Sequence, residues 1–190
     1  MKYKNRTYPL FSACGLNCGL CPRYHTNGSS KCPGCAGVGF SLVHPSCGVL
    51  SCCQRKEMEY CFLCEEYPCK KYDGADSFDS FITHKNQFCD MEKAKQSGIE
   101  TYQIELDEKM QILESLLRHY DDGRRKNFYC VAVNVLPLQD IKAAIQQIDC
   151  KIDWEMSLKE RAAAVVRLFE EIAKKQKISL RLRKRTNTIG

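Results

Sequence analysis

The cysteines of this chain are crowded into one segment, and this feature most constrains its fold. Eleven of the fourteen cysteines in the 190 residues fall between Cys14 and Cys69. Residues 12–72 are also rich in glycine and proline, with little helical periodicity. Such a segment cannot build a conventional apolar core, so disulfide bonds or metal–thiolate bonds must hold it.

The sequence of the first residues favours metal binding over disulfide bonds. Residues 1–18 read MKYKNRTYPLFSACGLNC, and polar residues, glycine and proline interrupt the apolar run that a secretory signal peptide needs. No segment approaches the roughly 20 apolar residues that span a bilayer. We therefore expect a cytoplasmic protein without a membrane partner, in which clustered cysteines are reduced and bind metal.

The cysteines form groups whose spacing is typical of zinc sites. The groups are Cys14-x₃-Cys18-x₂-Cys21, Cys32-x₂-Cys35, the set Cys47, Cys52 and Cys53, and Cys61-x₂-Cys64-x₄-Cys69. A Cys-x₂-Cys unit turns both sulfurs toward one point, and two such units supply the four tetrahedral ligands of zinc. The thiols suffice for two zinc ions, whereas a third would need His25 or His44. The spacing leaves the pairing open.

The remaining cysteines receive separate interpretations. Side chains of adjacent residues diverge, so we expect one ligand from Cys52 and Cys53, and Cys52 is the choice. Cys130 and Cys150 are isolated and are expected to be small buried apolar residues. Cys89 has no assigned role.

Iron is the alternative metal. The Cys14-x₃-Cys18-x₂-Cys21 spacing is the one that radical S-adenosylmethionine enzymes use for a four-iron cluster. Those enzymes need alternating strands and helices, which the sequence after residue 73 lacks. Leu20 also stands where they usually carry an aromatic residue. A simple iron–sulfur protein remains an alternative, although the spacings differ from the ferredoxin runs.

Apolar spacing predicts helices after the cysteine-rich segment. Residues 106–120 and 138–148 carry amphipathic patterns, and Ser157-x-x-Glu160 predicts a capping box that opens a final helix. The apolar run 127–136 fits a helix or a strand, and residues 178–183 could form a short edge strand. We predict a mostly α protein with an irregular, metal-stabilised N-terminal lobe and small β content. Its parts are a zinc-binding lobe at 1–72, a helical region at 73–177 and a basic segment at 178–190.

The positive charges gather near the end. Residues Lys174–Arg185 hold seven cations and no acid, within a formal net charge of +6. The stretch has no aromatic residue on which bases could stack, so the case for a nucleic acid partner is weaker than the case for a protein partner.

The motifs resemble a known family. CGLNCGLCP, KCPGC, YCFLCEEYPC and GIETY (residues 98–102) are similar to the prokaryotic, cysteine-rich domain of unknown function 3795, over roughly residues 12–120. That family is described as zinc-binding, with no established reaction. The resemblance implies these metal ligands: Cys14, Cys18, Cys21, Cys32, Cys35, Cys47, Cys52, Cys61, Cys64 and Cys69.

The expected function is binding rather than catalysis. No His-x-x-Glu-His or His-x-Glu pattern is present, and four thiolates leave zinc with little Lewis acidity. We name no catalytic residue. We expect two or three structural zinc ions that support partner binding, with an iron–sulfur, redox or metal-handling protein as the alternative.

Overall fold

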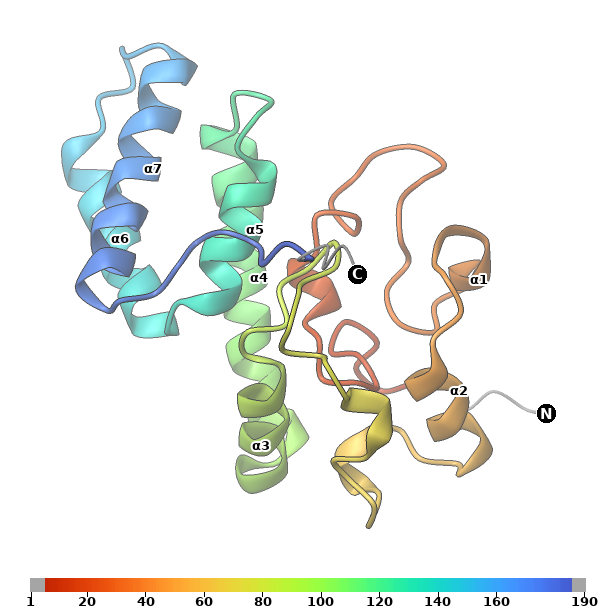
Figure 1. Cartoon of the computed structure of the whole chain (residues 1–190). Coiled ribbons are helices and arrows are strands. Elements are labelled where there is room, and N and C mark those ends of the chain that lie inside the picture. The colour runs from red at the N-terminus through yellow and green to blue at the C-terminus, as the bar shows by residue number, and fades with distance from the viewer. Residues whose placement is uncertain (1–5, 186–190) are drawn as a thin grey trace, which may run out of the picture.

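The chain is mostly helical, as predicted. A computed structural model describes residues 6–185, and this part contains seven α-helices joined by loops and three short 3₁₀ turns (Figure 1). The helices are α1 (Phe40–Val43), α2 (Gly48–Arg55), α3 (Gln87–Ser97), α4 (Ile99–Tyr120), α5 (Lys126–Val135), α6 (Leu138–Lys151) and α7 (Leu158–Lys175). The only β pairing among the described residues is one bridge between Phe11 and Asn17. The barrel of a radical enzyme is therefore not formed there.

Helix α4 is the centre of the helical part. Its inward side chains Leu106, Leu113 and Leu116 are fully buried, and α3, α5 and α7 all pack against it. The helix begins seven residues before the predicted stretch, because Gly98 (φ +87°) separates it from α3. It ends at Tyr120, where the Asp121 carboxylate accepts hydrogen bonds from the amides of Gly123 and Arg125.

The ambiguous apolar run is helix α5. Seven of its ten residues are buried, from Tyr129 to Val135. A helix that is apolar on most sides has to be surrounded, and α5 lies between α4 and the cysteine-rich part. Cys130 is buried there at 2% exposure, as predicted.

Helices α6 and α7 form a pair beside α4 and α5. The capping box at Ser157 and Glu160 is present, and Ala162, Val165 and Phe169 are buried on the inner face of α7. One prediction was wrong here. Cys150, which we expected to be buried, is exposed because it lies on the outer side of α6.

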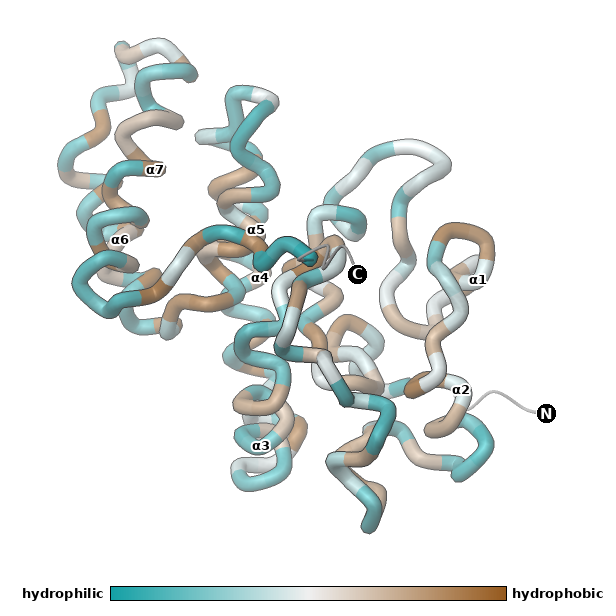
Figure 2. Tube along the Cα trace, viewed as in Figure 1, coloured by the Kyte–Doolittle hydropathy of each residue, from teal (hydrophilic) through white to brown (hydrophobic). Residues whose placement is uncertain are grey.

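The Cys-rich lobe, defined as residues 6–72, docks on the helices through its thiol turns. The 3₁₀ turn η1 (Cys18–Leu20) packs on α4 and α5, and η2 (Cys61–Leu63) packs on α3. One continuous apolar core therefore runs from Phe11 and Leu20 in the lobe to Phe169 in α7. Figure 2 shows that apolar residues also gather at the outer tip around α1.

Two glycines of CGLNCGLCP allow this docking. A Cβ on Gly19 would lie 2.4 Å from Met110 Sδ of α4, and a Cβ on Gly15 would lie 2.2 Å from Met91 Cγ of α3. Gly15 also has φ +87°, a conformation that favours glycine. These glycines let the motif backbone approach both helices.

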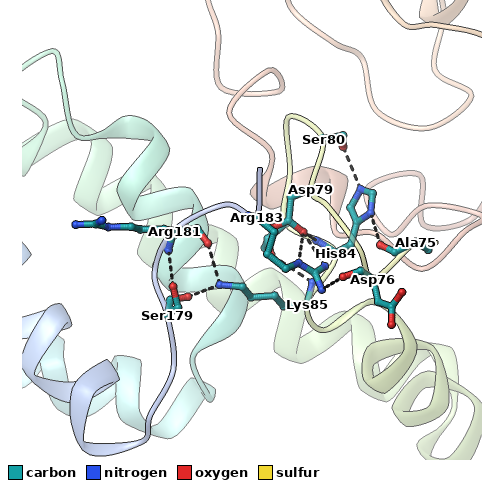
Figure 3. A network of polar contacts seen from close by, with 10 residues as sticks. Ala75, Asp76, Asp79, Ser80, His84, Lys85, Ser179, Arg181 and Arg183 are labelled. Carbon is teal, nitrogen blue, oxygen red and sulfur yellow. Dashed lines mark hydrogen bonds and ion pairs between the residues drawn. The ribbon is translucent and has the colours of Figure 1, made fainter. Parts of the chain in front are cut away.

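The basic segment after α7 is an extended strap. Among the described residues 178–185 there is no strand, so the edge-strand prediction was wrong; residues 186–190 lie outside the described part, as do residues 1–5. The strap crosses back to the loop 75–85 that follows the lobe (Figures 1 and 3). None of the described helices is long and apolar enough to cross a membrane.

Candidate metal centre

The two Cys-x₂-Cys units that dock the lobe share one backbone conformation. In η1 the amide of Cys21 donates to Cys18 O at 3.1 Å, and in η2 the amide of Cys64 donates to Cys61 O at 3.0 Å. The closing cysteines have φ and ψ of −84° and 134° at Cys21, and −83° and 135° at Cys64. Each unit is a single tight turn, within which the charges of the two thiols influence one another.

An inner thiol group lies where three segments of the lobe meet. It consists of Cys14, Cys18, Cys35 and Cys47, whose charges influence one another. Burial, with smaller contributions from Cys35 and Cys47, raises the pKa of Cys14 to about 11, against a hydrogen bond with Ser12. Burial, then Cys35 and Cys14, raise the pKa of Cys18 well above its usual value. Thiols from three segments of the lobe are thus near enough for their charges to interact, although no three of them have the geometry of a formed metal site within residues 6–185.

Two features organise the edge of the inner thiol group. Cys47 precedes α2, and its Sγ accepts a hydrogen bond from the amide of Leu50 at 3.4 Å, so the helix start fixes this thiol. Ser12 Oγ lies 3.1 Å from Cys14 Sγ. Both contacts hold sulfur atoms in place before any metal binds.

Arg6 is the cation beside this group. Its guanidinium lies over the Tyr60 ring at 4.8 Å, and Nη2 donates to Phe11 O at 2.6 Å. Its Nε and Nη1 are buried without a hydrogen-bond partner among residues 6–185. Burial raises the pKa of Cys35, and the positive charge of Arg6 opposes this rise. Buried N–H groups without a hydrogen-bond partner can donate to nearby sulfur atoms, and this favours the negatively charged thiolate form.

Cys21 and Cys32 form a second pair of thiols next to α5, and the charge of Cys21 also acts on Cys18 of the inner thiol group. The amide of Cys32 donates to Arg23 O at 2.9 Å, which closes the loop between the two cysteines. Burial raises the pKa of Cys21, with amides of Arg23 and Tyr24 lowering it and Cys32 raising it. Burial and then Cys21 raise the pKa of Cys130 to about 12. Cys130 is therefore a thiol close to this pair that sequence reasoning placed only in the core.

An outer thiol group lines a cavity of about 890 Å³. The group consists of Cys52, Cys53, Cys61, Cys64 and Cys69. Burial and then Cys61 raise the pKa of Cys53 to about 12. Both Cys52 and Cys53 reach the cavity wall, so adjacency on α2 does not remove one of them from this site. The sequence favoured Cys52 over Cys53 as the ligand, because the approach of Cys53 to Cys61 depends on the fold.

Lys56 is the cation of the outer thiol group. Its Nζ donates to Cys64 Sγ at 3.2 Å and pairs with Glu66 Oε1 at 3.0 Å. The two histidines have other contacts: His25 Nε2 lies 2.7 Å from Gly19 O, and His44 Nδ1 lies 2.8 Å from Pro45 O.

The donor chemistry fits a thiophilic metal ion. All fourteen cysteines are free thiols, and several have raised pKa values because they are buried beside one another. In residues 6–185, no three His, Cys, Asp or Glu side chains have the geometry of a formed site. Metal replaces thiol protons on binding, which removes the repulsion between crowded thiolates. Zinc accepts such all-sulfur sets.

Comparison with known proteins supports the resemblance over the lobe. No curated protein and no solved structure matches the chain. The family match ends at residue 74, so GIETY at 98–102 and helices α3–α7 fall outside it. Residues 10–74, which contain every ligand that the resemblance implies, match the family described as Protein of unknown function (DUF3795).

Proposed function

We propose that the Cys-rich lobe is a zinc-stabilised module that presents a binding loop to a protein partner. The observation that carries this proposal is the inner thiol group, in which Cys14, Cys18, Cys35 and Cys47 come together from three segments. The lobe contains only two short α-helices, so bonds from one zinc ion to four thiolates would add to the apolar core that the lobe shares with the helices.

The loop of residues 36–46 supports a protein as the partner. Both of its ends adjoin the inner thiol group, at Cys35 and Cys47. Val38 is fully exposed and Leu42 is 86% exposed, and the loop contains no charged residue. A nucleic acid needs cations for its phosphates, so an apolar, uncharged loop favours a protein surface.

Metal analysis tests the zinc part. Protein purified without oxygen is expected to contain two to three zinc ions and no visible absorbance. Cys14→Ser and Cys35→Ser should each lose zinc and lower the melting temperature of the lobe, whereas Cys150→Ser, on the exposed side of α6, should change neither. Iron with broad absorbance near 400 nm would favour the iron–sulfur alternative instead.

Site-specific cross-linking tests the partner part. A photoreactive residue at position 38 should capture one protein from the native host extract, only when zinc is bound. The same residue in place of Ile104, which is 63% exposed on α4, is the matched control. Equal capture at both positions, or capture from zinc-free protein, contradicts the proposal.

A further inference from the structure

The inner and outer thiol groups differ in access. The cavity is lined by all five thiols of the outer group and by none of the inner group. Its volume of about 890 Å³ greatly exceeds that of a metal ion or of one water molecule, about 30 Å³. A second molecule can therefore enter beside the outer thiols.

The outer group also has more thiols than a zinc ion uses. Zinc takes four ligands and can pass through a five-coordinate state. Five cysteines therefore leave one thiol free to enter while another leaves. Cys53 and Cys61 are buried at 5% and 6% exposure, whereas Cys64 and Cys69 are partly exposed. The buried Cys53 and Cys61 are suited to retaining a bound cation. The partly exposed Cys64 and Cys69 are suited to exchanging it.

The rim of the cavity is cationic. Arg55, Lys56, Lys70 and Lys71 line it, against the acids Glu66 and Asp73. Lys56 already donates to Cys64 Sγ at 3.2 Å, so a departing Cys64 thiolate keeps a positive partner. A positive rim raises the local concentration of small anions.

We propose that the outer thiol group is a metal-transfer site, which exchanges a thiophilic cation such as Zn²⁺ with a small anionic thiol. This rests on the proposed function, in which the inner thiol group holds zinc permanently. In the exchange, the incoming thiol gives its proton to water and its sulfur binds the cation. The Cys64–metal bond breaks, and the freed Cys64 thiolate takes a proton from water. The same exchange at the remaining cysteine ligands frees the cation with the small thiol, and atoms and charge balance at each exchange.

Release kinetics of the zinc-loaded, full-length chain test the proposal. Zinc captured by the chromophoric chelator 4-(2-pyridylazo)resorcinol should appear in a fast phase of one ion per chain, then a slow phase. Cys69→Ser should remove the fast phase and leave the slow phase and melting temperature unchanged. Cys89→Ser, at an exposed thiol outside both groups, should leave both phases intact.

Two thiols of different charge test the carrier. At equal thiolate concentration and low salt, mercaptoacetate should accelerate the fast phase about fivefold more than neutral 2-mercaptoethanol, because the rim attracts anions. This preference should vanish in 0.5 M salt and in the Lys70→Gln/Lys71→Gln variant.

Different results would contradict different parts of the proposal. Full zinc content released in one slow phase overturns the transfer site alone, as does a fast phase that survives Cys69→Ser. No difference between the two thiols overturns the anionic carrier. A chain that takes up no zinc overturns the proposed function and the transfer site together.

Discussion

Arg183 binds the carboxylate of Asp79 across 104 residues of sequence. The Arg183 Nη2 and Nε donate to Asp79 Oδ1 at 2.8 and 3.2 Å, and the Arg183 amide donates to Oδ2 at 2.7 Å (Figure 3). The Asp79 side chain is completely buried. Lys85 adds hydrogen bonds to Ser179 O and Arg181 O, so the strap is fastened at three places.

We expect Asp79→Asn to detach the strap. The change weakens charge-assisted hydrogen bonds that contribute about 1.5–3 kcal/mol each. Hydrogen exchange at residues 178–183 should become faster while α4 stays protected. Asp76→Asn is the matched control, because Arg183 contacts the backbone oxygen of Asp76 and not its carboxylate. Unchanged exchange in Asp79→Asn would contradict this assignment.

Acid should release the same strap. Burial raises the pKa of Asp79, but the hydrogen bonds from Arg183 and the His84 amide lower it more, so the net pKa is lowered. A lowered pKa stabilises the fold above the unfolded value of 3.8 and loses this contribution as the pH falls through the folded pKa. Protection factors at 178–183, which correct for the intrinsic exchange rate at each pH, should therefore fall below about pH 4, and not in Asp79→Asn.

Gly19→Ala should destabilise the docking of the lobe on α4. The new methyl group would lie 2.4 Å from Met110 Sδ, and overpacking of this kind costs about 1–3 kcal/mol. Met110→Ala should restore part of the loss in a double-mutant cycle, because it removes the clashing side chain. Gly48→Ala, with no atom within 4 Å of the added methyl group, should be close to neutral in urea denaturation.

Arg6→Met should weaken metal binding by the inner thiol group. The variant keeps an apolar stem against Tyr60 but removes the charge that favours the Cys35 thiolate. Loss of an outer-sphere partner typically lowers affinity about 10- to 100-fold. Competition with a zinc chelator measures this, and Arg6→Lys should recover part of the affinity. Equal affinity in all three proteins would remove Arg6 from the site.

Asp90→Asn should flatten the pH dependence of stability between about pH 4 and 7. Burial raises the pKa of Asp90 to about 6, against the Lys109 charge and hydrogen bonds from Asn17 and Tyr102. Because this pKa is raised, its contribution is present below 3.8 and is lost as the pH rises through about 6. The loss is on the order of 3 kcal/mol at most.

The comparison is made by urea denaturation of both proteins at several pH values. The difference between the two proteins cancels the contribution of bound metal. The amide oxygen of the substituted side chain can still accept the hydrogen bond that Asn17 donates to Asp90 Oδ2 at 2.9 Å in the native protein. Parallel stability curves for the two proteins would contradict the raised pKa of Asp90.

Local patterns predicted α4, α6 and α7, because helix formation depends on neighbouring residues, whereas they left α5 open and gave no ranges for α1, α2 and α3. The capping box at Ser157 follows from spacing alone. The prediction for Cys150 was wrong because an isolated cysteine carries no information about which side of α6 faces outward. The local sequence around Asp79 gives no sign of its role, since its partner Arg183 is 104 residues away.

The grouping of thiols depends on long-range contacts that spacing does not contain. The amide of Cys61 donates to Ala13 O at 2.8 Å, which places the fourth cysteine segment beside the first. Cys53 lies near enough to Cys61 for their charges to interact, and Cys130 approaches Cys21 because η1 packs on α5. The Cys-x₂-Cys turns themselves, being local, were predictable.

The turns η1 and η2 pack on α3, α4 and α5, and these helices are synthesised after the cysteines. All eleven clustered thiols leave the ribosome before the surfaces on which they rest, which end at Val135. At about 5–20 residues per second, the gap from Cys69 to Val135 lasts roughly 3–13 s. During that time the thiols of the nascent chain cannot yet pack against these helices. They are then exposed to oxidants and to free metal ions in the cell.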